Sequence, residues 1–139
     1  MVALNKTCVA AAALLIFIFF HVEISYSSHQ AGCGKTCVAV NCNTIGIRYG
    51  KFCGVGYTGC LGEKPCDHVD ACCKIHDECV GKHGVTSINC HESFKRCLGH
   101  VQKSGKVGFS TNCTYDIAVP TMIRGMDMAI LVSGFGRSK

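Results

Sequence analysis

Cysteine content constrains this chain more than any other feature of its sequence. The 139 residues include 13 cysteines, an odd number that internal disulfides alone cannot satisfy. Cys8 stands apart from the rest, inside an apolar N-terminal run. The other twelve predict six disulfides formed in an oxidising compartment. Because a domain of this size buries only a modest core, each crosslink, worth about 2–4 kcal/mol, matters to its stability.

The first 27 residues have the order of regions found in a secretory signal peptide. Lys6 precedes an apolar run, and the small residues Ser25 and Ser27 follow it, which predicts cleavage near Ser27. A membrane anchor is the alternative, but this run of about 14 residues is shorter than the roughly 20 that span a bilayer. We therefore assign residues 1–27 to a signal peptide and 28–139 to a secreted domain. The C-terminus is not a KDEL-type retention signal, so extracellular delivery is expected.

The formal net charge of the chain is +5. Cleavage does not change it, because Lys6 and Glu23 leave together. A basic secreted protein tends to associate with anionic surfaces, including membranes that contain acidic lipids, and Lys35, Arg48 and Lys51 are candidate contacts. No basic run with interleaved aromatic residues appears, so nucleic acid is not expected as a partner. A monomer is expected.

The chain between the signal peptide and the first long periodic segment is irregular. Residues 28–48 are polar and rich in cysteine, and we expect them to form a short helix or turn held by disulfides. Residues 49–62 hold many glycines, which favours a loop with unusual backbone angles over a regular helix.

Three helices are predicted in the remainder of the chain from the spacing of apolar residues. Asp67 is a start signal for the first, which is expected to end at Gly81, and Pro120 is placed in the first turn of the third. The helices are expected over residues 67–81, from a cap at Ser87 or Asn89 to Lys103, and over residues 119–132. The predicted fold is a small all-α, disulfide-rich domain.

The most chemically informative stretch is DACCKIHDEC, residues 70–79. It places His76 beside Asp77 on the first predicted helix, among three cysteines. A neutral histidine is a good general base for water, and calcium prefers carboxylates and backbone carbonyls as ligands. The glycine loop FCGVG, residues 52–56, can supply such carbonyls. Together these features predict metal-assisted hydrolysis. Zinc is the alternative, but the cysteines outnumber those of any zinc finger.

The order and spacing of these two motifs resemble those of the secreted phospholipase A2 family. The segment YGKFCGVGYTGC, residues 49–60, is similar to the calcium loop of that family, and residues 70–79 are similar to its active-site helix. Lys51, the segment from Cys60 to Cys66 and the twelve mature cysteines look most like the plant secretory branch.

The resemblance implies calcium-dependent hydrolysis of the sn-2 ester of glycerophospholipids at a membrane interface, which releases a free fatty acid and a lysophospholipid. His76 would activate the attacking water. Asp77 would bind Ca²⁺ together with the backbone carbonyls of Phe52, Gly54 and Gly56. The Gly54 amide and the cation would stabilise the oxyanion.

The resemblance also implies a disulfide framework around two long antiparallel helices. Three pairs carry over by position: Cys53–Cys73, Cys72–Cys97 and Cys79–Cys90. The other six cysteines permit 15 pairings, which the sequence leaves open. They are Cys33, Cys37, Cys42, Cys60, Cys66 and Cys113.

The chain departs from the animal members of the family around the catalytic histidine. Those members place an aspartate six residues before the cysteine matching Cys97, where this chain has His91, and a tyrosine where it has Val80. We hypothesise that His91, a water or a backbone carbonyl orients His76 instead. A surface histidine without a role is the alternative for His91. For the whole chain, the alternative function is a non-catalytic protein on the same scaffold that binds a membrane or a receptor, although the intact Asp77 favours the enzyme.

Overall fold

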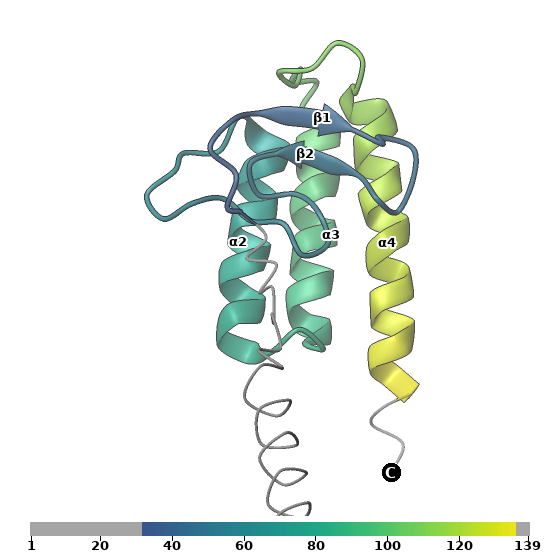
Figure 1. Ribbon diagram of the computed structural model, residues 1–139. Coiled ribbons are helices and arrows are strands. Elements are labelled where there is room, and N and C mark those ends of the chain that lie inside the picture. Colours follow the sequence, from purple (N-terminus) through teal and green to yellow (C-terminus); the bar gives the residue numbers. More distant parts are fainter. Residues whose placement is uncertain (1–31, 136–139) are drawn as a thin grey trace, which may run out of the picture. The chain divides into compact units, whose positions relative to one another are not determined.

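Three helices and a two-stranded sheet make up the part of the chain that the computed structural model describes, residues 32–135. The predicted signal peptide, residues 1–27, lies outside these residues. Helix α3 lies between α2 and α4 and packs against both (Figure 1). The elements are β1 (Val38–Val40), β2 (Arg48–Gly50), α2 (His68–His83), α3 (Ile88–Lys103) and α4 (Tyr115–Phe135). The prediction of a small, helical, disulfide-rich domain is confirmed, and the structure adds a two-stranded sheet to the helices.

Helices α2 and α3 are antiparallel and are locked in register by two disulfides. The crosslinks Cys72–Cys97 and Cys79–Cys90 step forward by seven residues along α2 and back by seven along α3, as an antiparallel pair requires. A tight turn from Gly84 to Ser87 joins the helices, and the Gly84 amide donates to the carbonyl of Val80 at 2.8 Å. The two disulfides therefore fix which residues of α2 face which residues of α3.

The N-terminus of α2 is held by Asp67. Its Oδ1 accepts the Asp70 amide at 3.0 Å, which caps the helix. Its Oδ2 accepts the hydroxyl of Tyr49, on β2, at 2.5 Å and the amide of Phe109, before α4, at 3.1 Å. One carboxylate thus joins the start of α2 to two segments that are distant in sequence.

A second carboxylate, that of Asp70, holds the loop that follows β2. Asp70 is fully buried. Its oxygens accept the amides of Phe52 at 2.8 Å, Lys51 at 2.9 Å and Cys66 at 2.8 Å. Gly50 permits this approach, because its φ is +67° and a Cβ there would collide with the Asp70 carboxyl group. The glycine loop is therefore anchored directly to α2.

The sheet was not predicted. We expected a short helix or turn over residues 28–48, and residues 32–48 contain no helix, but turns lie between Asn41 and Ile47. Strand β1 pairs antiparallel with β2, with Ala39 opposite Tyr49. Each strand has three residues, too few to show an alternating pattern in sequence. The strands are stabilised by their hydrogen-bonded pairing more than by the strand propensity of their residues. Disulfides fasten this region to the rest: Cys33–Cys60, Cys37–Cys66 and Cys42–Cys113.

The helix ends also differ from prediction. Helix α2 continues through Gly81 to His83, and Gly84 supplies the C-cap. Helix α4 begins at Tyr115, so Pro120 lies inside the helix and not in its first turn. The Pro120 ring removes one backbone hydrogen bond. Burial of apolar side chains in the first turns of α4 outweighs that loss, since Tyr115, Ala118 and Val119 are all buried.

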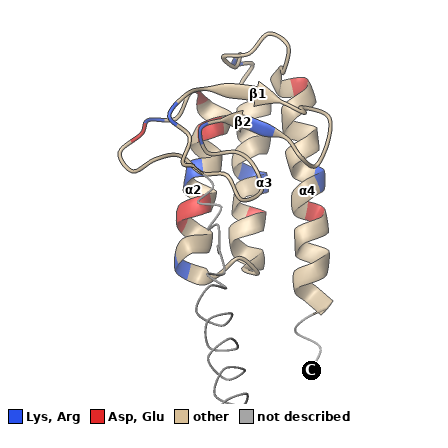
Figure 2. Ribbon diagram, viewed as in Figure 1, with Lys and Arg blue, Asp and Glu red and all other residues tan. Residues whose placement is uncertain are grey.

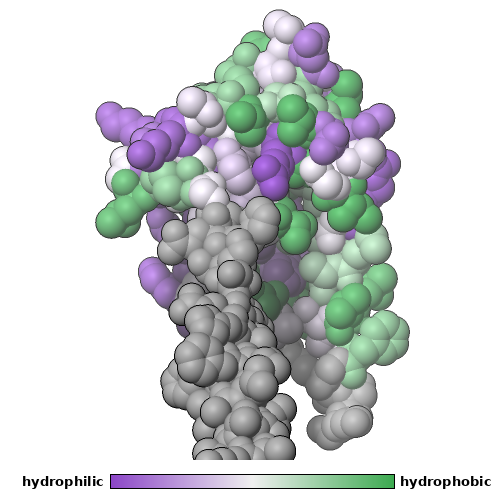
Figure 3. All heavy atoms as spheres, in the orientation of Figure 1, coloured by the Kyte–Doolittle hydropathy of each residue, from purple (hydrophilic) through white to green (hydrophobic). Residues whose placement is uncertain are grey.

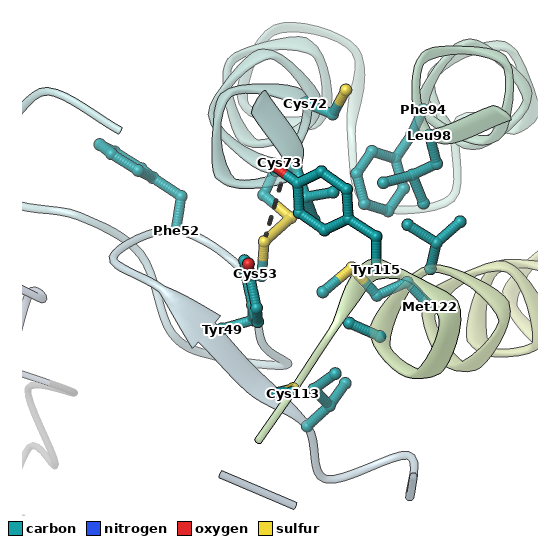
Figure 4. Close-up of a cluster of buried hydrophobic side chains, with 14 residues drawn as sticks. Tyr49, Phe52, Cys53, Cys72, Cys73, Phe94, Leu98, Cys113, Tyr115 and Met122 are labelled. Carbon is teal, nitrogen blue, oxygen red and sulfur yellow. Dashed lines mark hydrogen bonds between the residues drawn. A yellow bond between two sulfur atoms is a disulfide. The ribbon is translucent and has the colours of Figure 1, made fainter. Parts of the chain in front are cut away.

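The hydrophobic core lies where the loop after β2 meets the three helices. Figure 4 shows Tyr49 and the Cys53–Cys73 disulfide beside Tyr115 and Met122 of α4. Phe94 and Leu98 of α3 complete the same cluster, and both are buried. The core therefore joins the glycine loop to the helices through apolar packing as well as through a disulfide.

We predict that Asp70→Ala destabilises the protein by about 3 kcal/mol or more. The substitution leaves three backbone amides without their buried acceptor, and each unsatisfied group costs roughly 1–3 kcal/mol. Denaturant unfolding with the disulfides intact measures the effect. Glu78→Ala, on the exposed side of the same helix, is the control and should change stability little. Equal stability of the two variants would contradict an anchoring role for Asp70.

Candidate active site

The predicted catalytic residues lie on α2 and border one cavity. His76 and Asp77 line a cavity of about 320 Å³, and the glycine loop contributes Phe52, Gly54 and Gly56 to its wall. The Cys53–Cys73 disulfide joins this loop to α2 one turn before His76. The structure therefore brings together the histidine, the carboxylate and the loop that the sequence singles out.

His76 is in direct contact with His91 of α3. The Nε2 atom of His76 lies 3.0 Å from Nδ1 of His91, and the His76 ring stacks on Phe94 with 4.7 Å between centroids. His91 is 3 % exposed, so it is not a surface histidine. The register set by the two helix-linking disulfides places His91 across from His76.

This contact is compatible with the protonation pattern that a catalytic base would need. If Nε2 of His76 carries the proton and donates it to His91, then Nδ1 of His76 keeps its lone pair for a water. His91 then carries its own proton on Nε2. That atom is buried and has no hydrogen-bond partner among the described residues. In this arrangement His91 acts as a hydrogen-bond acceptor for His76.

Burial lowers the pKa of His76 to about 4, and repulsion from His91 acts in the same direction. The cause is desolvation, which disfavours the charged imidazolium. His76 is therefore neutral at pH 7. Among residues 32–135, no carboxylate is hydrogen-bonded to the ring to stabilise its protonated form.

Asp77 shows the opposite shift. Burial raises its pKa to about 6, while a hydrogen bond from the Thr58 hydroxyl, at 2.7 Å, opposes the shift. Asp70 and Glu78 add repulsion. No cationic side chain pairs with Asp77 in the described part of the chain. A bound cation would stabilise the ionised form of such a partly buried carboxylate.

Backbone carbonyls are the other donors available to a cation at this site. Within residues 32–135, no three His, Cys, Asp or Glu side chains come together as a metal site. The Gly54 carbonyl accepts the Tyr57 amide at 3.2 Å and keeps a second lone pair. Gly54 has a φ of +152°, a conformation that favours glycine. One carboxylate with several carbonyls is a donor set suited to a hard cation such as calcium.

Comparison with known proteins places this arrangement in a family. Probable phospholipase A2 homolog 1 of rice, Oryza sativa subsp. japonica, is 56% identical over 77% of this chain and 78% of its own length. The chain belongs to the phospholipase A2 family. Phospholipase A2-gamma of Arabidopsis thaliana is 47% identical over 96% of this chain and 71% of its own length. No protein-family model matches the chain.

Solved structures agree with this assignment. A rice phospholipase A2 in complex with octanoic acid superposes with a TM-score of 0.67 and 33% identity, over 75% of this chain and 92% of that one. The predicted family, fold class and enzyme class, phospholipase A2, are thereby confirmed.

Two residues of the site carried no assigned role in the sequence reasoning. Thr58 donates to the Asp77 carboxylate, and Asp70 anchors the loop through three amides. Thr58 lies in a glycine-rich loop, where a hydroxyl residue usually indicates a turn. Nothing in the local sequence therefore predicts its hydrogen bond to Asp77. Asp70 is predictable as an anchoring residue. A carboxylate among cysteines and apolar residues at the start of a helix is expected to be buried and to accept hydrogen bonds.

We predict that His76 stays neutral down to about pH 4 and that His91→Asp raises its pKa. A carboxylate at the position of His91 would stabilise the imidazolium form. Titration of the His76 ring resonances by NMR measures both values. His100→Gln, an exposed change on the same helix α3, is the control and should leave the titration unchanged. A wild-type pKa near 6.5 would contradict the account of a desolvated ring.

Proposed function

We propose that the chain is a secreted, calcium-dependent phospholipase A2 that hydrolyses the sn-2 ester of glycerophospholipids at a membrane interface. The observation that carries this proposal is the shared cavity of His76, Asp77 and the glycine loop. Family membership supports the chemistry, because the named relatives are phospholipases A2. The six disulfides support secretion through an oxidising compartment, and a signal peptide over residues 1–27 remains the proposed route.

His76 is the proposed general base. Its Nδ1 atom takes a proton from a water, which attacks the ester carbonyl without an acyl-enzyme. His91 is the proposed positioning residue, because its Nδ1 atom accepts the Nε2 proton and holds the ring in one tautomer. A histidine in place of a carboxylate gives a weaker stabilisation of the imidazolium, so the proton is returned readily to the leaving alkoxide.

Asp77 and the carbonyls of Phe52, Gly54 and Gly56 are the proposed calcium ligands. The raised pKa of Asp77 and the second lone pair of the Gly54 carbonyl support this assignment. When bound, calcium supplies Lewis-acid polarisation of the ester carbonyl. The protein's own contribution to the oxyanion is the Gly54 amide, which stands on the loop that Asp70 fixes.

The cavity suits an acyl chain. Most of its wall is apolar, and Ile47, Phe94 and Met122 contribute to it. The rice phospholipase A2 solved with octanoic acid holds a fatty acid, which supports a fatty-acyl group as the apolar part of the substrate here.

The end of α4 supports contact with a lipid surface. Beyond Asp127, the helix carries no charged residue (Figure 2), and apolar side chains gather on its surface (Figure 3). The exposed apolar residues there are Met128, Leu131, Val132 and Phe135. Their spacing puts them on one side of the helix.

Arg48 and Lys35 are exposed and stay candidates for contact with acidic lipids, whereas Lys51 is paired with Glu63 at 2.6 Å.

We predict that fatty-acid release from phospholipid vesicles requires calcium and is abolished by chelator. Asp77→Asn should lose activity by at least about a hundredfold, because an amide is a weak ligand and carries no charge to offset the cation. Release of labelled fatty acid from sn-2-labelled vesicles measures the effect. Glu78→Gln, the adjacent exposed carboxylate, is the matched control and should stay active.

A second readout separates binding from chemistry. Calcium should raise the melting temperature of the wild-type protein and of Glu78→Gln, and leave that of Asp77→Asn unchanged. The stabilisation should weaken as the pH falls below about 6, because protons then compete with the cation for Asp77. Activity that persists in chelator would overturn the calcium mechanism, and inactivity under every condition would favour the binding-protein alternative.

We predict that His91→Ala lowers kcat by roughly 10- to 100-fold with little change in KM. The His76 Nε2 proton then loses its buried acceptor, a loss of about 1–3 kcal/mol in positioning the base. His91→Asn should recover part of kcat, because its amide oxygen can accept the same proton. Steady-state kinetics on mixed micelles measure the split. An unchanged kcat and pH profile in His91→Ala would remove His91 from the mechanism.

A further inference from the structure

Helix α4 forms one wall of the cavity. Its contribution comes from Thr121, Met122, Gly125, Met126 and Ala129. These residues recur at intervals of three and four, so they share one face of the helix. The wall therefore runs along the helix axis for about two turns.

Gly125 stands in the middle of this wall, and nothing in the fold requires a glycine there. Glycine in a helix interior is less stable than alanine. Gly125 is not among the residues with positive φ, so its backbone angles suit any residue. A Cβ built on it meets no atom within 4 Å, so no neighbour excludes a side chain. The space that a side chain would fill belongs to the cavity.

The residues one turn before and one turn after Gly125 are also small. Thr121, Gly125 and Ala129 are four residues apart and lie one above another on the helix, and the flexible Met122 and Met126 flank them. The cavity thus keeps an unobstructed strip along α4. The same cavity is lined by His91, whose buried Nε2 has no partner among the described residues.

We infer that Gly125 determines the length of acyl chain that the enzyme accepts, by leaving the α4 wall of the cavity open at its middle. The inference rests on the proposed function, because it takes the cavity as the site of the acyl chain. A side chain at position 125 would project into the space that a long hydrocarbon chain needs. A short chain would still fit, so the residue sets selectivity and takes no part in the chemistry.

The test compares a long-chain with a short-chain substrate. Dioleoyl- and dioctanoyl-phosphatidylcholine are presented in mixed micelles of the same detergent, with calcium, and the ratio of their kcat/KM values is measured. One methylene in an apolar pocket changes discrimination by about 10- to 200-fold. Gly125→Leu should therefore lower the long-to-short ratio by about tenfold or more, and Gly125→Ala should lower it less.

Gly99→Leu is the matched control. Gly99 is also in the middle of a helix, α3, and a Cβ there meets no atom within 4 Å, but it does not line the cavity. Its substitution should gain the same helical stability and leave the ratio unchanged. An unchanged ratio in Gly125→Leu, or an equal loss on both substrates, would overturn the inference.

Direct binding separates this inference from the proposed function. Calorimetric titration with oleate and octanoate should show that Gly125→Leu weakens oleate binding and spares octanoate. If the wild-type protein hydrolyses neither substrate, the proposed function fails, and the titration still tests Gly125. If oleate affinity is the same in both proteins, the inference fails whether or not the protein is an enzyme.

Discussion

The buried carboxylate of Asp70 is the interaction on which the rest of the site depends. A loop rich in glycine has high conformational entropy, and holding it in one geometry requires strong local bonds. Asp70 supplies three of them to backbone amides of Lys51, Phe52 and Cys66, and Gly50 makes room for its carboxyl group. Because Asp70, His76 and Asp77 lie on the same helix, the loop and the side chains that share its cavity have one rigid support.

The disulfides perform a related task between helices. Cys72–Cys97 and Cys79–Cys90 lie on either side of His76 along α2, and they set the register that places His91 opposite. In a domain with a modest core, apolar packing alone gives a weaker constraint on such a register. In the proposed mechanism the crosslinks would therefore serve catalysis as well as stability, since they fix a 3.0 Å contact between His76 and His91, which lie on different helices.

The sequence predicted what short-range patterns encode. Helical periodicity located α2, α3 and α4, and the His76-Asp77 motif and the glycine loop identified residues that line one cavity. The β1–β2 pair was not predicted, because each strand is three residues long and the two strands are not adjacent in sequence. The early start of α4 was not predicted, because a proline such as Pro120 favours the first turn of a helix. The burial of Tyr115 and Val119 instead sets the start of the helix. The Thr58–Asp77 hydrogen bond joins residues 19 apart, and no local pattern encodes such a pair.

His76, the proposed base, and Asp77, the proposed calcium ligand, have pKa values shifted in opposite directions by the same cause. Burial lowers the pKa of His76 to about 4 and raises that of Asp77 to about 6, so desolvation favours the neutral form of each. A histidine must be neutral to accept a proton. Burial favours the protonated form of the Asp77 carboxylate, and a bound cation would restore its ionised form. A divalent cation beside Asp77 would favour the ionised carboxylate and would further disfavour the imidazolium of His76. The apolar surroundings thus prepare both residues for a site in which charge is supplied by a bound cation and not by a second acidic side chain.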